Sequence, residues 1–245
     1  MLRFVMMLIT CFLLLLAGYA LFQRKLLYYP THHRDTNGLS EWRQLGEVIG
    51  YAREVPAPRN VWLMMHGNAG QASDRVYALA SFSRQDSVYI LEYPGYGSRP
   101  GSPSMASFNK AAEEGYRTLR ARFPHTPVCA VGESVGSGPA SALAGESPPP
   151  DRIVLITPFD LLSRVANYHF PYLPARLVLR DNWNNVQALK GYRGPVEIFG
   201  ARDDTIIPVR FARALAENVA AATFHEIPGG HNEWAVAGRV EIRNP

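Results

Sequence analysis

The chain has 245 residues and a formal net charge of +4, from 25 basic and 21 acidic side chains. Hydrophobic residues make up 47% of it and charged residues 19%, a balance that excludes an intrinsically disordered chain. The basic residues form no run or stripe and no Cys/His cluster has metal-ligand spacing, so the sequence indicates neither a nucleic-acid-binding protein nor a metal site.

The first predicted element is an apolar helix. The run from Phe4 to Phe22 carries no charged side chain and is long enough, at about 1.5 Å per residue, to cross roughly 30 Å of hydrocarbon. It is apolar on every side, which disfavours a buried core helix. We predict a single-pass membrane anchor in residues 1–25, with a cleaved signal peptide as the alternative. The flanking charges nearly cancel, so the side of the membrane stays open.

Residues 26–245 alternate apolar runs with amphipathic stretches, which predicts one α/β domain with a mostly parallel sheet flanked by helices. The expected strands are 61–65, 87–92, 127–131, 153–156, 196–199 and 223–227, and the expected helices are 73–84, 105–123, 135–144 and 209–221. The stretch 159–194 is rich in aromatic and arginine residues. We expect it to form a short cap-like insert whose helices overhang one end of the sheet.

A small-residue loop, His66-Gly67-Asn68-Ala69-Gly70, follows the first of these strands. A loop of this kind can point a backbone N–H at a reacting oxygen. The alternative interpretation is an ordinary glycine turn beside a histidine whose hydrogen bonds are satisfied.

The segment Gly132-Glu133-Ser134-Val135-Gly136 lies between a predicted strand and a predicted helix. A serine on such a tight turn exposes its hydroxyl, which makes Ser134 a candidate nucleophile. The Val135 N–H, at the start of the helix, is a candidate donor to an oxyanion. For Glu133 we expect a surface carboxylate that complements the helix dipole.

A serine nucleophile needs a histidine base and a carboxylate that orients the base. His231 lies in a flexible loop after the last predicted strand, whereas His225 falls inside that strand and His169 falls in the insert, so His231 is the better candidate. The acid should end the strand before the 209–221 helix, where Asp203 and Asp204 compete. Adjacent side chains point apart, so only one of them can face the imidazole.

Five motifs in order resemble the α/β-hydrolase superfamily: HGNAG, EYPGYGSRPGSPS, GESVG, GARDDTIIP and PGGHNEW. The likeness covers residues 26–235 and is greatest to the membrane-anchored serine hydrolases, which include depalmitoylases and serine-aminopeptidase-like bacterial hydrolases. The resemblance implies an α/β-hydrolase fold, with Ser134 as nucleophile and His231 as base. It also implies that the backbone N–H groups of Asn68 and Val135 form the oxyanion hole.

The resemblance leaves the acid less well defined. Relatives carry the acid in an Asp-x-Ile/Val-Ile/Val-Pro pattern, which selects Asp204, but they also place it three residues after the glycine, which selects Asp203. We take Asp204 as the candidate.

These patterns predict a membrane-anchored serine hydrolase that cleaves an ester, thioester or related acyl bond through an acyl-enzyme. We expect a small-molecule or acylated substrate and no cofactor, metal or nucleic-acid partner. One alternative is an aminopeptidase-like amide hydrolase, which the short, arginine-rich insert disfavours. The other is a binding protein on a hydrolase fold without turnover.

Overall fold

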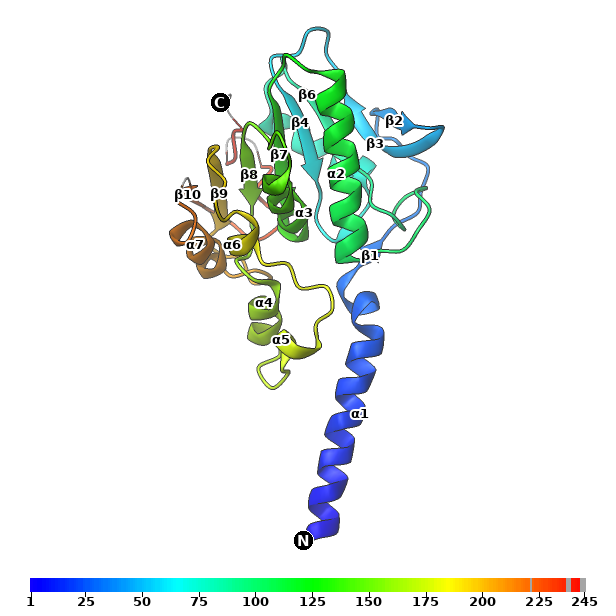
Figure 1. The fold of residues 1–245 in the computed structure, drawn as a ribbon, viewed down its shortest axis with the longest axis vertical. Helices are drawn as coiled ribbons and strands as arrows, with labels where there is room; N and C mark the ends of the chain where they lie inside the picture. Colours follow the sequence, from blue (N-terminus) through cyan, green and yellow to red (C-terminus); the bar gives the residue numbers. More distant parts are fainter. Residues whose placement is uncertain (221, 237–238, 243–245) are drawn as a thin grey trace.

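The computed structural model describes residues 1–220, 222–236 and 239–242. Helix α1 (Leu2–Leu27) projects from an α/β domain as a single rod (Figure 1). By length and composition α1 could cross a membrane, and no other helix in the described ranges meets that test. The helix ends two residues beyond the predicted anchor, and its last turn lies against the domain.

The domain is built on one eight-stranded sheet with the order β10-β9-β8-β7-β4-β6-β3-β2. All neighbours pair in parallel except β2 with β3 and β3 with β6. The strands are β2 (Ser40–Gln44), β3 (Glu47–Arg53), β4 (Val61–Met65), β6 (Ser87–Leu91), β7 (Val128–Glu133), β8 (Ile153–Ile156), β9 (Val196–Ala201) and β10 (Ala222–Ile227). Two further short strands, β1 (Tyr29–Pro30) and β5 (Ala69–Gly70), pair with each other beside the sheet.

Alternation along the strands gives the sheet two apolar faces. In β4, Leu63 joins the core beneath helices α2 (Met105–Arg122), α3 (Ser137–Ala142) and α7 (Val209–Glu217), while Trp62 joins the core on the opposite face. That opposite face is covered by the 3₁₀ segment η1 (Ala72–Ser81) and by Trp234 near the C-terminus. Burial on both faces explains why the central strands read as continuous apolar runs.

This architecture confirms the predicted α/β class with a mostly parallel sheet flanked by helices. The hairpin β2–β3 is absent from the predicted strands, because edge strand β2 carries polar, exposed residues around buried Trp42. The helix predicted at 73–84 is η1, a 3₁₀ segment, and that predicted at 135–144 is divided into η2 (Ser134–Gly136), α3 and η3 (Leu143–Gly145). Helix α7 ends before its predicted limit, residue 221, which lies outside the described residues.

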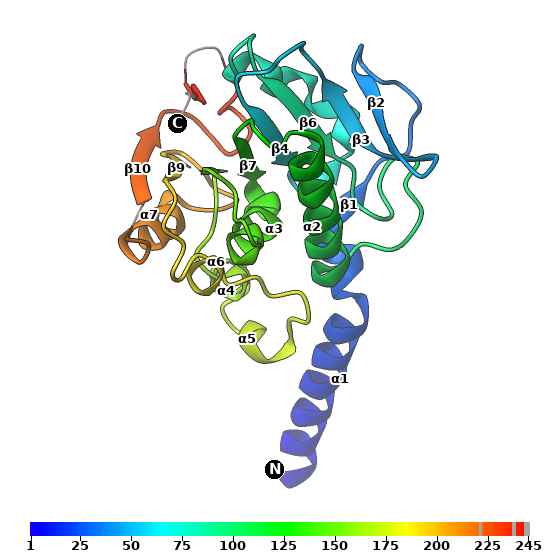
Figure 2. The ribbon, with the colours of Figure 1, turned by 45° about the horizontal axis from the view of Figure 1, so that its top comes forward.

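The stretch 159–194 contains three short helices, α4 (Leu162–His169), α5 (Ala175–Val178) and α6 (Asn185–Ala188). Figures 1 and 2 show α4 and α5 beyond the end of the sheet that faces α1. The motif residues also follow the carboxyl ends of their strands, the edge where parallel α/β sheets place their ligands.

Candidate active site

The turn at Ser134 is a strained junction between β7 and η2. Ser134 has φ of +54°, a left-handed conformation that is uncommon for a residue with a side chain. A Cβ atom on Gly132 would lie 2.6 Å from the Gly136 carbonyl oxygen, and one on Gly136 would lie 2.2 Å from the Met65 carbonyl oxygen. Both glycines are therefore required by close backbone contact, which holds the serine at the tip of a sharp turn.

Ser134, His231 and Asp204 form a buried chain of hydrogen bonds from the ends of β7, β10 and β9. The distance from Ser134 Oγ to His231 Nε2 is 2.9 Å, and that from His231 Nδ1 to Asp204 Oδ2 is 2.6 Å. The other carboxylate oxygen, Asp204 Oδ1, accepts the backbone N–H groups of Ile206 at 2.8 Å and Ile207 at 2.7 Å. These backbone donors fix the carboxylate, and the carboxylate orients the imidazole toward the serine hydroxyl.

The competing residues occupy different environments. Asp203 is exposed, and its backbone N–H donates to the Gly229 carbonyl, so the structure brings Asp204 rather than Asp203 to the imidazole. His225 stacks on Phe199 within the sheet, with ring centroids 4.8 Å apart. His169 lies 2.8 Å from the Ile206 carbonyl oxygen through its Nε2. Among the described histidines, only His231 is hydrogen-bonded to the Ser134 hydroxyl.

The loop that carries Asn68 is tied to the end of α1. The Asn68 side chain donates to the Leu27 carbonyl at 2.7 Å, and the Asn68 carbonyl accepts from the Tyr29 N–H at 3.1 Å and the Tyr96 hydroxyl at 2.7 Å. Asn68 and Val135 both line the cavity that reaches Ser134. Asn68 belongs to the loop after β4 and Val135 to the turn after β7, so the two residues reach this cavity from different segments of the chain.

His66 belongs to the interior rather than to the cavity. Its ring is fully buried, its Nδ1–H donates to the Gly67 carbonyl at 2.7 Å, and it packs on Tyr93 with ring centroids 4.4 Å apart. The interpretation as a packed interior histidine fits these contacts, but its hydrogen bonds are not all satisfied: Nε2 is buried with no hydrogen-bond partner among the described residues, and Glu92 Oε1 lies 3.6 Å away.

Glu133 is not the expected surface carboxylate. Its side chain is buried and accepts hydrogen bonds from the Gly67 N–H (3.1 Å), Trp234 Nε1 (3.1 Å) and the Tyr77 hydroxyl (3.2 Å). The Arg75 guanidinium lies 3.6 Å away. The expectation was wrong because these partners are distant in the sequence. One signal was available: Glu133 ends a strand whose other residues are all apolar or glycine.

The surroundings of Glu133 keep it ionised. Burial alone would raise the pKa of this carboxyl, but Arg75 and the N–H donors of Trp234 and Gly67 outweigh burial and hold the pKa below its ordinary value. An ionised carboxylate directly before Ser134 therefore connects the turn, the Gly67 loop and the C-terminal segment.

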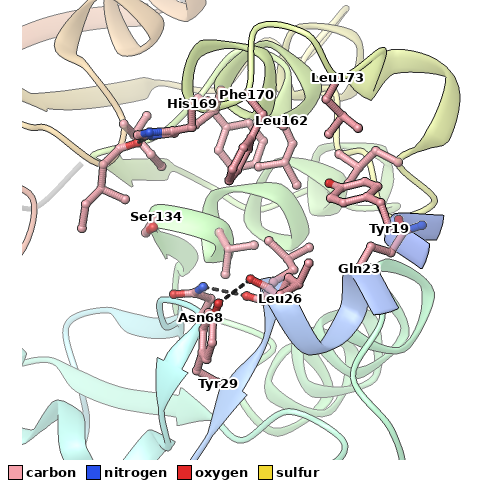
Figure 3. Close-up of a pocket in the computed structure, with 18 residues that line it drawn as sticks. Tyr19, Gln23, Leu26, Tyr29, Asn68, Ser134, Leu162, His169, Phe170 and Leu173 are labelled. Carbon is pink, nitrogen blue, oxygen red and sulfur yellow. Dashed lines mark hydrogen bonds between the residues drawn. The ribbon is translucent and has the colours of Figure 1, made fainter. Parts of the chain in front are cut away.

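Ser134 lies on the walls of two cavities, and of the two only the second has charged side chains in its wall. The first, here called the inner pocket, has a volume of about 450 Å³ and mostly apolar walls. Figure 3 shows Tyr19, Gln23 and Leu26 of α1 facing Leu162, Phe170 and Leu173 of the stretch 159–194 across this pocket. The second, here called the polar pocket, has a volume of about 390 Å³, and its wall includes Arg75, Tyr77, Glu133, His231 and Asn232.

In the described ranges, no group of three or more His, Cys, Asp or Glu side chains is arranged to hold a metal ion. The chemistry that the site offers is that of a hydroxyl next to a carboxylate-supported imidazole: the imidazole can accept the hydroxyl proton as the oxygen attacks an electrophile.

No protein-family model matches the chain. It is 33% identical to the Mycobacterium tuberculosis (strain CDC 1551 / Oshkosh) uncharacterized protein MT2364, over 86% of this chain and 81% of that protein. It is 27% identical to the Danio rerio lysophosphatidylserine lipase ABHD12, over 71% of this chain and 51% of the lipase. It is 24% identical to the Arabidopsis thaliana alpha/beta hydrolase domain-containing protein WAV2, over 93% of this chain and 88% of that protein.

The fold is also similar to solved structures. Est1E from Butyrivibrio proteoclasticus superposes with a TM-score of 0.64 and 13% identity, over 81% of this chain and 93% of that one. At this identity the likeness shows the fold alone.

Proposed function

Since this chain belongs to the α/β-hydrolase superfamily, we propose that it is a serine hydrolase that cleaves the ester, or a related acyl bond, of an amphiphilic substrate. The observation that carries this proposal is the hydrogen-bonded chain from Ser134 through His231 to Asp204, buried at the junction of an apolar and a polar cavity. A hydroxyl, an imidazole and a carboxylate in this relation are the groups that nucleophilic acyl transfer needs.

In the proposed reaction, Ser134 Oγ attacks the substrate carbonyl while His231 Nε2 takes the hydroxyl proton. Asp204 holds the Nδ1–H and stabilises the imidazolium. The backbone N–H groups of Asn68 and Val135 stabilise the oxyanion, a contribution of about 3 kcal/mol for one donor. The imidazolium returns the proton to the leaving alcohol or thiol, and the acyl group stays on Ser134. Water, deprotonated by His231, then releases the acid.

The two cavities support an amphiphilic substrate class. The inner pocket offers apolar walls to an acyl chain, and the polar pocket offers Arg75, Tyr77 and Asn232 to a polar leaving group. The lysophosphatidylserine lipase relative has a name that fits such a substrate, and this chain spans about half the length of that protein. We propose a lipid ester with one acyl chain in the inner pocket.

We also propose that residues 1–25 are a retained membrane anchor and residues 26–245 the catalytic domain, with residues 159–194 as its cap. Contacts of the last turns of α1 support retention over cleavage. Gln23 Nε2 donates to the Val178 carbonyl at 3.1 Å, and Arg24 pairs with the buried Asp181 at 2.8 Å. Gln23 and Arg24 would remain after cleavage behind Ala20, so the stronger support for retention lies upstream, where Tyr19 lines the inner pocket.

Covalent labelling tests the proposal. A fluorophosphonate probe should label the wild-type full chain in detergent micelles, and Ser134→Ala should abolish the labelling. Ser141→Ala is the matched control: this serine of α3 is buried and its hydroxyl has no hydrogen-bond partner among the described residues, so its loss should leave labelling unchanged.

Equal labelling of Ser134→Ala and wild type would refute Ser134 as the nucleophile. The wild type should also hydrolyse p-nitrophenyl acyl esters faster than aminoacyl anilides; a preference for anilides would favour the aminopeptidase-like alternative. Absence of both labelling and turnover would favour the binding protein.

A further inference from the structure

One face of α1 lines two cavities in succession. Tyr19, Gln23 and Leu26 line the inner pocket. Phe12, Leu15 and Leu16 line a groove of about 390 Å³ between α1 and the cap loop 169–173, here called the outer groove. Spacings of three and four residues place all six side chains on the same side of the helix.

The outer groove and the inner pocket are neighbours along the cap. His169, Phe170 and Leu173 contribute to the walls of both. The two cavities therefore adjoin between α1 and the cap loop, and the inner one reaches Ser134.

The cap presents apolar side chains beside the exposed part of α1. Phe170 is 61% exposed, Tyr172 92% and Leu177 85%. Figure 1 shows α5 and its neighbouring loop beyond the sheet, on the side from which α1 projects. Exposed apolar residues around a transmembrane-length helix are favourable at the boundary of a bilayer and unfavourable in water.

The last turns of α1 are fixed to the cap by polar contacts. Gln23 is buried, and besides its bond to Val178 its Oε1 accepts the Arg180 N–H at 2.6 Å. Asp181 is buried and accepts two hydrogen bonds from Arg24, at 2.8 and 3.2 Å, and one from the Tyr28 hydroxyl at 3.0 Å. The wall that α1 gives to the inner pocket is thus a constant part of the cavity.

We propose that α1 forms one wall of the acyl-binding site, and that the acyl chain of a membrane-resident ester enters sideways from the bilayer through the outer groove. The inference rests on the proposed function, because Ser134 is taken as the nucleophile. In this proposal, α1 both holds the enzyme at the membrane and selects the substrate by acyl-chain length. The substrate class is a long-chain ester that is already dissolved in the bilayer.

Chain-length profiles of the full chain reconstituted in phosphatidylcholine vesicles test the wall. Leu26→Trp should fill part of the inner pocket and lower the ratio of kcat/KM for p-nitrophenyl palmitate to that for p-nitrophenyl butyrate by about tenfold or more, the effect of excluding two methylene groups. Leu21→Trp is the matched control, because Leu21 is exposed on the opposite face of α1 and should leave both rates unchanged.

Entry is tested with the same proteoliposomes. The palmitate ester should be hydrolysed faster when it is dissolved in the vesicles that carry the protein than when it is supplied in separate protein-free vesicles, whereas the butyrate ester should show no such difference. Equal palmitate rates in the two arrangements would overturn entry from the bilayer.

An unchanged palmitate-to-butyrate ratio in Leu26→Trp would overturn the proposed wall. Fluorophosphonate labelling checks that the variant is folded, and Leu26→Phe takes its place if the larger ring prevents folding. If the wild type neither reacts with the probe nor cleaves the butyrate ester, the proposed function itself is refuted. If the wild type cleaves the butyrate ester but Leu26→Trp leaves the chain-length profile unaltered, only the proposed wall is refuted.

Discussion

The turn at Ser134 and the wall formed by α1 border the same cavity but are built in different ways. At the turn, backbone atoms approach so closely that a Cβ on either glycine would clash, and the neighbouring carboxylates Glu133 and Asp204 are buried and hydrogen-bonded. At the wall, the side chains are mostly apolar and several are exposed. Directional hydrogen bonds fix atoms to within tenths of an ångström, whereas apolar contact depends on area and tolerates variation.

This difference predicts that substitutions at the turn alter the rate of bond cleavage or the stability of the domain, and that substitutions at the wall alter which substrate is preferred. We expect the largest difference in kcat/KM between variants of two adjacent aspartates, Asp204, which faces the imidazole, and Asp203, which does not.

Asp204→Asn should lower kcat/KM for p-nitrophenyl butyrate by about 10⁴-fold, because an amide in place of the carboxylate cannot favour the imidazole tautomer that accepts the serine proton. Asp203→Asn should keep kcat/KM within about twofold of the wild-type value, since the Asp203 side chain is exposed and the imidazole is hydrogen-bonded to Asp204 instead. Steady-state kinetics of both variants measure the effect. A larger loss for Asp203→Asn would exchange the roles of the two residues.

Glu133→Gln should lower the free energy of unfolding by about 3 kcal/mol, because it leaves the largely buried Arg75 without its partner. Glu54→Gln is the control: the Glu54–Arg122 pair is 2.7 Å long but exposed, so its loss should cost at most about 1 kcal/mol. Chemical denaturation of both variants measures the difference. Equal losses would mean that the Glu133 network contributes no more than a surface ion pair.

Glu133 also sets a pH dependence. Its folded-state pKa lies below the ordinary value of 4.5, so its contribution to stability is present above that value and is lost as the pH falls through the folded-state pKa. Wild-type stability should therefore fall more steeply below about pH 4.5 than that of Glu133→Gln. Denaturation curves at several pH values would reveal parallel slopes if Glu133 were not involved.

The smallest effect is expected where α1 meets the cap. Arg24→Gln should cost about 1 kcal/mol, because Arg24 is half exposed while its partner Asp181 keeps the Tyr28 hydroxyl. Lys25→Gln, the next residue of the helix, makes no ion pair within the described part of the chain and should have no effect. Thermal unfolding in detergent measures both, and a loss as large as that of Glu133→Gln would contradict the proposed difference between the two regions.

Local pattern was sufficient for the sheet. The six predicted strands correspond to β4 and β6 to β10. Strands β4, β6, β7 and β8 are buried along their whole length and are nearly continuous apolar runs, whereas β10 is a half-exposed edge strand. Local pattern was insufficient for the hairpin β2–β3: edge strand β2 is polar and mostly exposed apart from buried Trp42, and β3, although buried from Ile49 to Ala52, was not predicted either. The predicted helix 135–144 is instead three short segments, the first of which begins at Ser134 in the left-handed region and passes close to the Met65 backbone at Gly136. Local sequence patterns do not predict such tertiary contacts.

In the candidate site, too, some residues could be predicted from local sequence and others depend on tertiary contacts. Ser134 and His231 stand out through the residues around them, and their catalytic roles remain predictions. The choice between Asp203 and Asp204 depends on the direction of each side chain after β9. Glu133 was assigned wrongly because Trp234, Tyr77 and Gly67 reach it only after the chain has folded. The contribution of α1 to the inner pocket also depends on tertiary contacts, since composition alone describes that segment as an anchor.

The hydrogen bond between the Asn68 side chain and the Leu27 carbonyl affects whether the N-terminal helix can be replaced by that of another protein. A hydrophobic leader that only tethers an enzyme can be replaced by any other of equal length. Here the last turns of the leader support the Asn68 loop, pair with the cap and enclose the inner pocket. A chimera that takes its first 27 residues from another membrane protein should remain attached to the membrane but lose its preference for acyl-chain length. We therefore expect substitutions in the helix and in the domain to be coupled in evolution.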